Sequence, residues 1–214
     1  MGFFNKIFED IKSNRKDIIY TIDRSHGSGG YEVAKRLSEK LNIPLYDEKI
    51  IELKTLEGKV NPDNIKKDDS FLQGTIYDLY RENYSYSQED ITNVDAAFLA
   101  NSKTIRDFAK KGPCILMGKC SNYVLREYKN VFNVFIDADE NFRIKRLMEF
   151  YNADEEKAGI KMRKTDVRRK NHYNRYANGE WGMSSQYDIT FNSSSYDFDT
   201  IADIIIKAST ELKK

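Results

Sequence analysis

Four small residues in a row, Gly27, Ser28, Gly29 and Gly30, form the stretch of this sequence best suited to chemistry. Their backbone amides can close around a phosphate from several directions, because no side chain there is larger than a hydroxymethyl group. Arg24 stands just before the run and could add a positive charge through a bidentate guanidinium. A glycine turn that binds no ligand is the alternative interpretation of this stretch taken alone.

The elements on either side must position these glycines. Residues 18–22 are β-branched or aromatic throughout, which is typical of a buried strand in a parallel sheet. Apolar residues recur at helical spacing in residues 31–41, so the glycines lie at a predicted helix N-terminus, where the dipole favours an anion. The full phosphate-loop pattern G-x-x-x-x-G-K-[ST] is absent, because Gly30 replaces its lysine and Tyr31 replaces the hydroxyl residue that binds magnesium.

The run TIDRSHGSGGYEVAKRLSEKLNIPLYD resembles the opening of the cytidylate kinase-like family, a branch of the P-loop nucleoside monophosphate kinases that reads approximately I-S-R-x-x-G-S-G-G. The second predicted strand, residues 42–47, matches the family's I-P-F-Y-D, and residues 110–125 and 160–188 continue the resemblance. It implies an ATP-dependent kinase with Mg²⁺ and CMP as acceptor. It also implies a P-loop kinase-like three-layer fold with a mostly parallel sheet.

Within KKGPCILMGKCSNYVL, the resemblance implies contacts to the acceptor. Lys119 stands where the family has an arginine that helps hold the acceptor's phosphate, and Asn122 stands where an aspartate is usual. Lys119 as a solvated residue at a helix start is the alternative. Asp47 follows the second predicted strand and is a candidate acceptor contact, or else the cap of a helix over residues 48–56.

Residues 161–170 are the most basic stretch of the chain, and the segment from there to residue 188 resembles the family pattern D-K-x-R-x-x-Y-Y…G-x-x-W-G…Y-D. In such kinases a lid carries arginines that close over the transferred phosphoryl group. Arg169 is the first candidate for this role, followed by Arg163 and Arg168. A solvated helix face or a nucleic-acid patch would explain the basic run in another way.

Four further residues complete this comparison. His172 replaces a tyrosine of the pattern, and Trp181 is expected to pack the far end of the lid against the sheet. Arg143 and Arg146 match arginines of the family, and we expect them either near the donor nucleotide or in structural ion pairs.

Composition limits the remaining possibilities. The chain has 214 residues and a net charge of +1, so a general attraction to nucleic acid is not indicated. Without a secretory signal, Cys114 and Cys120 are expected to be reduced thiols in a cytoplasmic protein. An amphipathic helix is predicted for residues 1–16, which docks on the domain or a partner chain, or lies weakly on a membrane surface. The sequence also leaves open whether the chain forms a homo-oligomer.

Five strands are predicted near residues 18, 43, 114, 131 and 187, most followed by a helical pattern, which indicates a doubly wound α/β fold. We expect one domain over residues 17–214, with an acceptor-binding insertion at about 57–93 and a lid at about 154–186. The predicted function is ATP-dependent phosphoryl transfer to a nucleoside monophosphate, CMP- or dCMP-like, or to another small acceptor. The alternative is a catalytically weak or inactive nucleotide-binding regulatory protein, since the loop lysine is missing.

Overall fold

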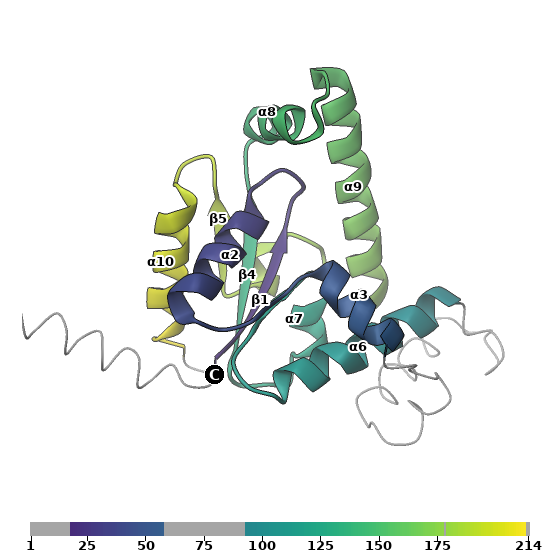
Figure 1. Cartoon of the computed structure of the whole chain (residues 1–214), viewed down its shortest axis with the longest axis vertical. Helices are drawn as coiled ribbons and strands as arrows, with labels where there is room; N and C mark the ends of the chain where they lie inside the picture. The colour runs from purple at the N-terminus through teal and green to yellow at the C-terminus, as the bar shows by residue number, and fades with distance from the viewer. Residues whose placement is uncertain (1–17, 58–92, 178, 213–214) are drawn as a thin grey trace, which may run out of the picture.

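The computed structural model describes residues 18–57, 93–177 and 179–212, and the fold rests on these (Figure 1). The helix predicted for residues 1–16 lies outside them, as does nearly all of the predicted insertion. The described strands are β1 (Ile19–Arg24), β2 (Leu45–Tyr46), β3 (Ile115–Met117), β4 (Val131–Asp137) and β5 (Ile189–Asn192). The described helices are α2 (Gly30–Leu41), α3 (Glu48–Glu57), α6 (Asn93–Ala109), α7 (Ser121–Val124), α8 (Glu140–Tyr151), α9 (Glu155–Tyr176), the 3₁₀ helix η2 (Ser184–Gln186) and α10 (Phe198–Ser209).

The five described strands form one parallel sheet in the order β2-β3-β1-β4-β5. β1 lies at its centre, where Thr21 pairs with Leu116 of β3 on one side and with Asn133 of β4 on the other. Each strand forms where the sequence predicts one, because each is a short apolar run that follows a turn. This order brings the carboxyl ends of β1 and β3 side by side, which is where parallel α/β sheets bind ligands.

Side chains of β1 alternate between two hydrophobic cores, one on each face of the sheet. Tyr20 and Ile22 belong to the core that α2 and α10 cover, and Ile19 belongs to the core formed with α6, α7 and the end of α9. Figure 1 shows α2 and α10 together on one side of the sheet and α6 with α7 on the other. The three-layer α/β fold with a parallel sheet is therefore confirmed.

Helix α2 shows why the helix after the glycine loop forms. Val33 and Leu37 are completely buried and lie one turn apart on the same face. Burying each such side chain contributes roughly 1.5–3 kcal/mol, which fixes the helix on the sheet. α10 packs beside it and begins at Phe198, because the Asp197 carboxylate accepts the amides of the first turn.

Helix α9 is the long element that extends beyond the layers. Its 22 residues run from α8 at the edge of the molecule to the region of α6 and α7 (Figure 1). The Asp154 side chain caps its first turn, and Met162 packs with Leu147 of α8 in a small separate core. At the other end of α9, Tyr173 and Tyr176 pack in the core that α6 and α7 form against the sheet. One helix therefore connects two distant parts of the fold.

Candidate active site

The glycine loop joins the carboxyl end of β1 to the first turn of α2. Gly27 and Gly29 have left-handed backbones, with φ of 86° and 81°, which glycine adopts without the strain that a side chain would bring. Among the described residues, no acceptor is bonded to the amides of Gly27, Gly29, Gly30 or Tyr31. The loop therefore presents free N–H donors at the positive end of a helix dipole, an arrangement that suits a phosphate.

Close packing explains why the loop is made of glycines. A Cβ atom on Gly29 would lie 2.3 Å from ring carbons of Phe198, and one on Gly30 would lie 2.6 Å from Cβ of Arg24. Ser28 is fully buried, and its hydroxyl and its amide both donate to the carbonyl of Ser25. The Ser28 side chain, predicted to help bind the nucleotide, therefore shapes the turn from inside.

Two arginines of α8 hold the outer side of the loop. Arg146 donates from Nε to the carbonyl of Gly27 at 3.1 Å and pairs with a glutamate of α2. The buried Arg143 pairs with Asp166 of α9 at 2.6 Å, and the other Asp166 oxygen accepts the amide of His26 at 2.7 Å. Ion pairing is thus the role that the structure shows for both arginines, and it ties α8 and α9 to the loop.

Arg24 extends toward β3 and α3 rather than over the free amides. Its Nη1 donates to Oε1 of Glu48 at 2.9 Å. The same nitrogen lies 2.7 Å from the position that a Cβ atom on Gly118 would take, so the guanidinium passes close to the turn after β3. The guanidinium charge of Arg24, which we expected at the glycine loop, is therefore paired with the Glu48 carboxylate of α3.

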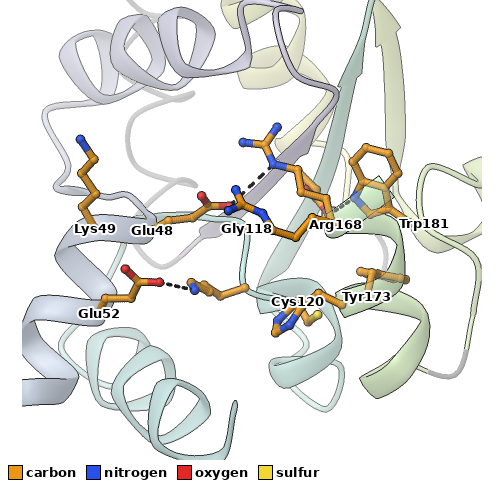
Figure 2. A pocket seen from close by; sticks show the side chains of 12 residues that line it. Glu48, Lys49, Glu52, Gly118, Cys120, Arg168, Tyr173 and Trp181 are labelled. Carbon is orange, nitrogen blue, oxygen red and sulfur yellow. Dashed lines mark hydrogen bonds and ion pairs between the residues drawn. The ribbon is translucent and has the colours of Figure 1, made fainter. Parts of the chain in front are cut away.

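A cavity of about 370 Å³ lies between α3, the turn after β3, and α9 (Figure 2). Its volume is in the range of small-molecule sites. The cationic side chains in its walls are Lys49, Lys119, Arg168 and Arg169. The carboxylates in its walls are Asp23, Glu48 and Glu52. The cations exceed the carboxylates by one, so the cavity suits a small anionic ligand.

Arg169 lies between the loop and the cavity. Its Nη1 donates to the carbonyl of Arg24 at 3.0 Å, and its side chain is only 14% exposed. Burial and the Arg24 charge lower the pKa of Arg169, although a guanidinium stays protonated at neutral pH. Its Nε atom is buried and has no hydrogen-bond partner among the described residues. A buried, unpaired N–H of a cation is costly, and an anionic oxygen would satisfy it.

The turn after β3 has a strained backbone. Gly118, Lys119 and Cys120 all have positive φ, at 69°, 55° and 57°, which costs roughly 1–2 kcal/mol for a residue with a side chain. A Cβ atom on Gly118 would lie 2.6 Å from Oε1 of Glu48. This turn directs Lys119 to the cavity, where its ammonium group pairs with Glu52 of α3. Strain of this kind is concentrated at functional sites.

Two predicted acceptor contacts point elsewhere. Asn122 is buried, and its Nδ2 donates to the hydroxyl of Tyr173 at 2.8 Å, so it supports the cavity wall from behind. The Asp47 carboxylate accepts the amide of Ile50 at 2.9 Å, which confirms the alternative that Asp47 caps the next helix. Neither residue is among the described residues that line the cavity.

Of the other predicted residues, some line the cavity and others lie near the glycine loop or α8. Arg168 is exposed and lines the cavity from α9, whereas Arg163 pairs with Glu140 at 3.3 Å, next to α8. Tyr31 is half exposed in the first turn of α2. His172 faces the cavity, and burial together with the Lys119 charge lowers its pKa to about 4, so its ring is neutral at physiological pH.

Asp23 belongs to the site although the motif comparison does not single it out. Its buried carboxylate accepts the indole N–H of Trp181 at 2.8 Å, the Tyr187 hydroxyl at 3.4 Å and the Arg24 amide at 2.9 Å. Burial raises its pKa, more than the neighbouring arginines lower it. Trp181 also packs edge-on against Phe135 of β4, which confirms its expected packing role. An acidic residue at the end of a buried strand was the available signal in the sequence.

Thiol chemistry is not supported at this site. Cys114 and Cys120 are both free and buried, in agreement with the expected reduced state. Burial raises the pKa of Cys114 to about 12 and raises that of Cys120 as well, so both stay protonated.

One known protein family matches most of the chain. The model of the cytidylate kinase-like family matches residues 19–195. The chain belongs to this family. The match confirms the resemblance that the glycine loop and the later segments indicated, and it spans every described strand. No match is found among curated proteins.

Solved structures give the same fold. An uncharacterized protein from Eubacterium ventriosum ATCC 27560 is 29% identical, with a TM-score of 0.69 over 89% of this chain and 96% of that one. A gluconokinase from Sinorhizobium meliloti 1021 is 12% identical, with a TM-score of 0.50 over 92% and 94%. A shikimate kinase from Acinetobacter baumannii, in complex with shikimate, is 11% identical, with a TM-score of 0.49 over 94% and 99%. The likeness to the gluconokinase is one of fold, that of the P-loop kinases.

The described residues contain neither a membrane-spanning helix nor a metal-binding cluster. None of their helices has the length and apolar character needed to cross a membrane. They also contain no group of three or more His, Cys, Asp or Glu side chains placed to hold a metal ion.

Proposed function

We propose that this protein transfers a phosphoryl group from ATP to a nucleoside monophosphate such as CMP or dCMP, or to another small acceptor. One observation carries the proposal. A glycine loop with free amides and a cationic cavity meet at Arg169, whose guanidinium donates to the carbonyl of Arg24 at the end of β1 and lines the cavity. Membership of the cytidylate kinase-like family supports a cytidine nucleotide as acceptor.

In this proposal, the glycine loop and the cavity have separate roles. The amides from Gly27 to Tyr31 would hold the donor's phosphates. Lys119 and Arg168, together with the guanidinium groups of Arg24 and Arg169 beside Glu48, would hold the acceptor's phosphate. Arg169 would stabilise the negative charge that spreads over the transferred group. Phosphoryl transfer needs positioning and positive charge more than covalent help from the protein. The loop amides and the cationic side chains are groups of the type that this reaction needs.

The loop suits the phosphates of ATP, because the amides of Gly27, Gly29, Gly30 and Tyr31 have no acceptor among the described residues and lie at the N-terminus of α2. Mg²⁺ would neutralise charge on the donor phosphates. The described residues offer no three-ligand cluster, and Tyr31 stands where a short hydroxyl ligand is expected, so phosphate oxygens and water would supply most of its coordination.

A second candidate is a nucleotide-binding regulatory protein with weak or no catalysis. The pairing of Arg24 with Glu48 favours it, because the guanidinium then does not replace the missing loop lysine.

One assay separates the two. Purified protein with ATP and Mg²⁺ is mixed with CMP, dCMP, UMP, AMP or no acceptor, and ADP is followed by a coupled enzyme assay. Arg169→Ala and Arg24→Ala remove the two guanidinium groups of the site, and Lys164→Ala is the control because Lys164 is exposed on the same helix as Arg169.

We expect ADP formation with a cytidine nucleotide, retained in Lys164→Ala and reduced at least 100-fold in Arg169→Ala, as is typical when a charge at the transition state is removed. ATP binding by calorimetry without turnover for any acceptor would support the regulatory protein instead. Absence of ATP binding would overturn both candidates.

A further inference from the structure

Two carboxylates of α3 neutralise the cations of the cavity. Glu48 and Glu52 lie four residues apart, so they share one face of the helix, and Figure 2 shows both on the cavity side of α3. Glu48 bonds Arg24, and Glu52 bonds Lys119. The groups best suited to bind an acceptor's phosphate are therefore already paired with acids of the protein itself.

The pairing at Glu48 is incomplete. Its Oε1 atom lies 2.9 Å from Nη1 of Arg24 and 4.0 Å from Nε of Arg169. The second distance is too long for a hydrogen bond, and Nε of Arg169 is buried without any partner among the described residues. One carboxylate oxygen thus lies between two guanidinium groups and satisfies only one of them.

A phosphate would satisfy both arginines better than Glu48 does. It has more oxygens directed to different sides and carries up to two negative charges, so it can accept from two guanidinium groups at once. The Glu48 carboxylate is ionised at neutral pH, because Arg24 and Arg169 lower its pKa against the effect of burial. If Glu48 stayed in place, its charge would repel the incoming phosphate.

We propose that Glu48 occupies the acceptor's phosphate position in the free protein, and that a phosphorylated acceptor binds by displacing this carboxylate from Arg24 and Arg169. The proposal rests on the proposed function, since it concerns the same cavity and a phosphorylated acceptor. It makes Glu48 a specificity-determining residue. A nucleoside without a phosphate cannot compensate the two arginines and therefore cannot replace Glu48, so the cavity selects nucleoside monophosphates over nucleosides.

The test is a gain of affinity. Glu48→Gln keeps the size of the side chain and an oxygen for Arg24 but removes the competing charge. Titration calorimetry compares CMP, inorganic phosphate and cytidine on the wild type and this variant. Glu211→Gln, an exposed residue after α10, is the control for the change in net charge, and Glu52→Gln tests the more exposed carboxylate of α3.

We expect CMP and inorganic phosphate to bind Glu48→Gln about tenfold more tightly than the wild type, because a negative charge has been removed from beside two largely buried arginines. Cytidine affinity should not change. Glu211→Gln should leave all affinities within about twofold, and Glu52→Gln should strengthen phosphate binding less than Glu48→Gln, because its charge is screened by solvent.

Removal of Glu48 also leaves two buried arginines facing each other, so the variant is expected to melt at a lower temperature in phosphate-free buffer. Inorganic phosphate should then raise its melting temperature more than that of the wild type. Binding to Glu48→Gln that is equal to or weaker than wild type would overturn the proposal, as would a variant that phosphate does not stabilise more than the wild type.

The two proposals fail separately. If the wild type phosphorylates CMP but Glu48→Gln binds CMP no more tightly, the kinase activity stands and displacement of Glu48 is wrong. If no acceptor yields ADP but Glu48→Gln binds phosphate tenfold more tightly, displacement stands and the proposed activity is wrong.

Discussion

Replacement of Gly29 by alanine tests how the glycine loop is held. Gly29 has a φ of 81°, and a residue with a side chain pays about 1–2 kcal/mol for this conformation. The new methyl group would also lie 2.3 Å from two ring carbons of Phe198. The ring would have to leave its position, where the Arg146 guanidinium lies 4.9 Å from its centroid, and overpacking of this kind costs about 1–3 kcal/mol. The sum is about 2–5 kcal/mol, a large share of the stability of a domain.

The two contributions can be separated in a double-mutant cycle with Phe198→Ala. Urea unfolding is followed by the fluorescence of Trp181, the single tryptophan of the chain. In the Phe198→Ala background, Gly29→Ala should cost only the backbone part, about 1–2 kcal/mol. An equal cost in both backgrounds would show that the ring does not require glycine at this position and would refute the packing argument.

Three further predictions concern single residues of the site. Asp23→Asn should lower the free energy of unfolding by about 1–3 kcal/mol, because an amide cannot accept from both Trp181 and the Arg24 amide. Because burial raises the pKa of Asp23, the wild type loses stability as pH rises above 3.8, and urea titrations at increasing pH should show a narrowing difference from the variant. Asp166→Ala should cost about 3 kcal/mol by leaving Arg143 unpaired on that side, and NMR should show faster hydrogen exchange at the His26 amide. Lys119→Gly should raise the free energy of unfolding by about 1 kcal/mol in thermal melts by relieving a φ of 55°, while calorimetry shows weaker CMP binding.

The framework of the fold could be predicted because its signals are local. β1 and β4 are apolar runs, and α2 repeats its buried residues at helical spacing, so sequence order alone locates them. Periodicity alone does not determine where α10 begins, because the Asp197 cap sets its first residue. A helix start next to Lys119 was anticipated, but its length was not, because the four residues of α7 give no periodic pattern.

The candidate site was only partly predictable, because its pairings depend on tertiary structure. The glycine loop was visible as a motif, and Lys119 and Arg169 as matches to a family pattern. The direction of the Arg24 side chain could not be predicted, because it depends on a contact with Glu48 of α3. The burial of Ser28 likewise follows from contacts with residues after β5, far away in the chain.

Helix α9 has a consequence for how the two halves of the site depend on each other. Asp166 in its middle holds the His26 amide of the loop, and Arg169, one turn later, faces the cavity. Both belong to one uninterrupted helix, so α9 connects the glycine loop directly to the cavity. If a ligand at the loop and a ligand in the cavity change each other's affinity through this helix, thermodynamic linkage requires the two factors to be equal.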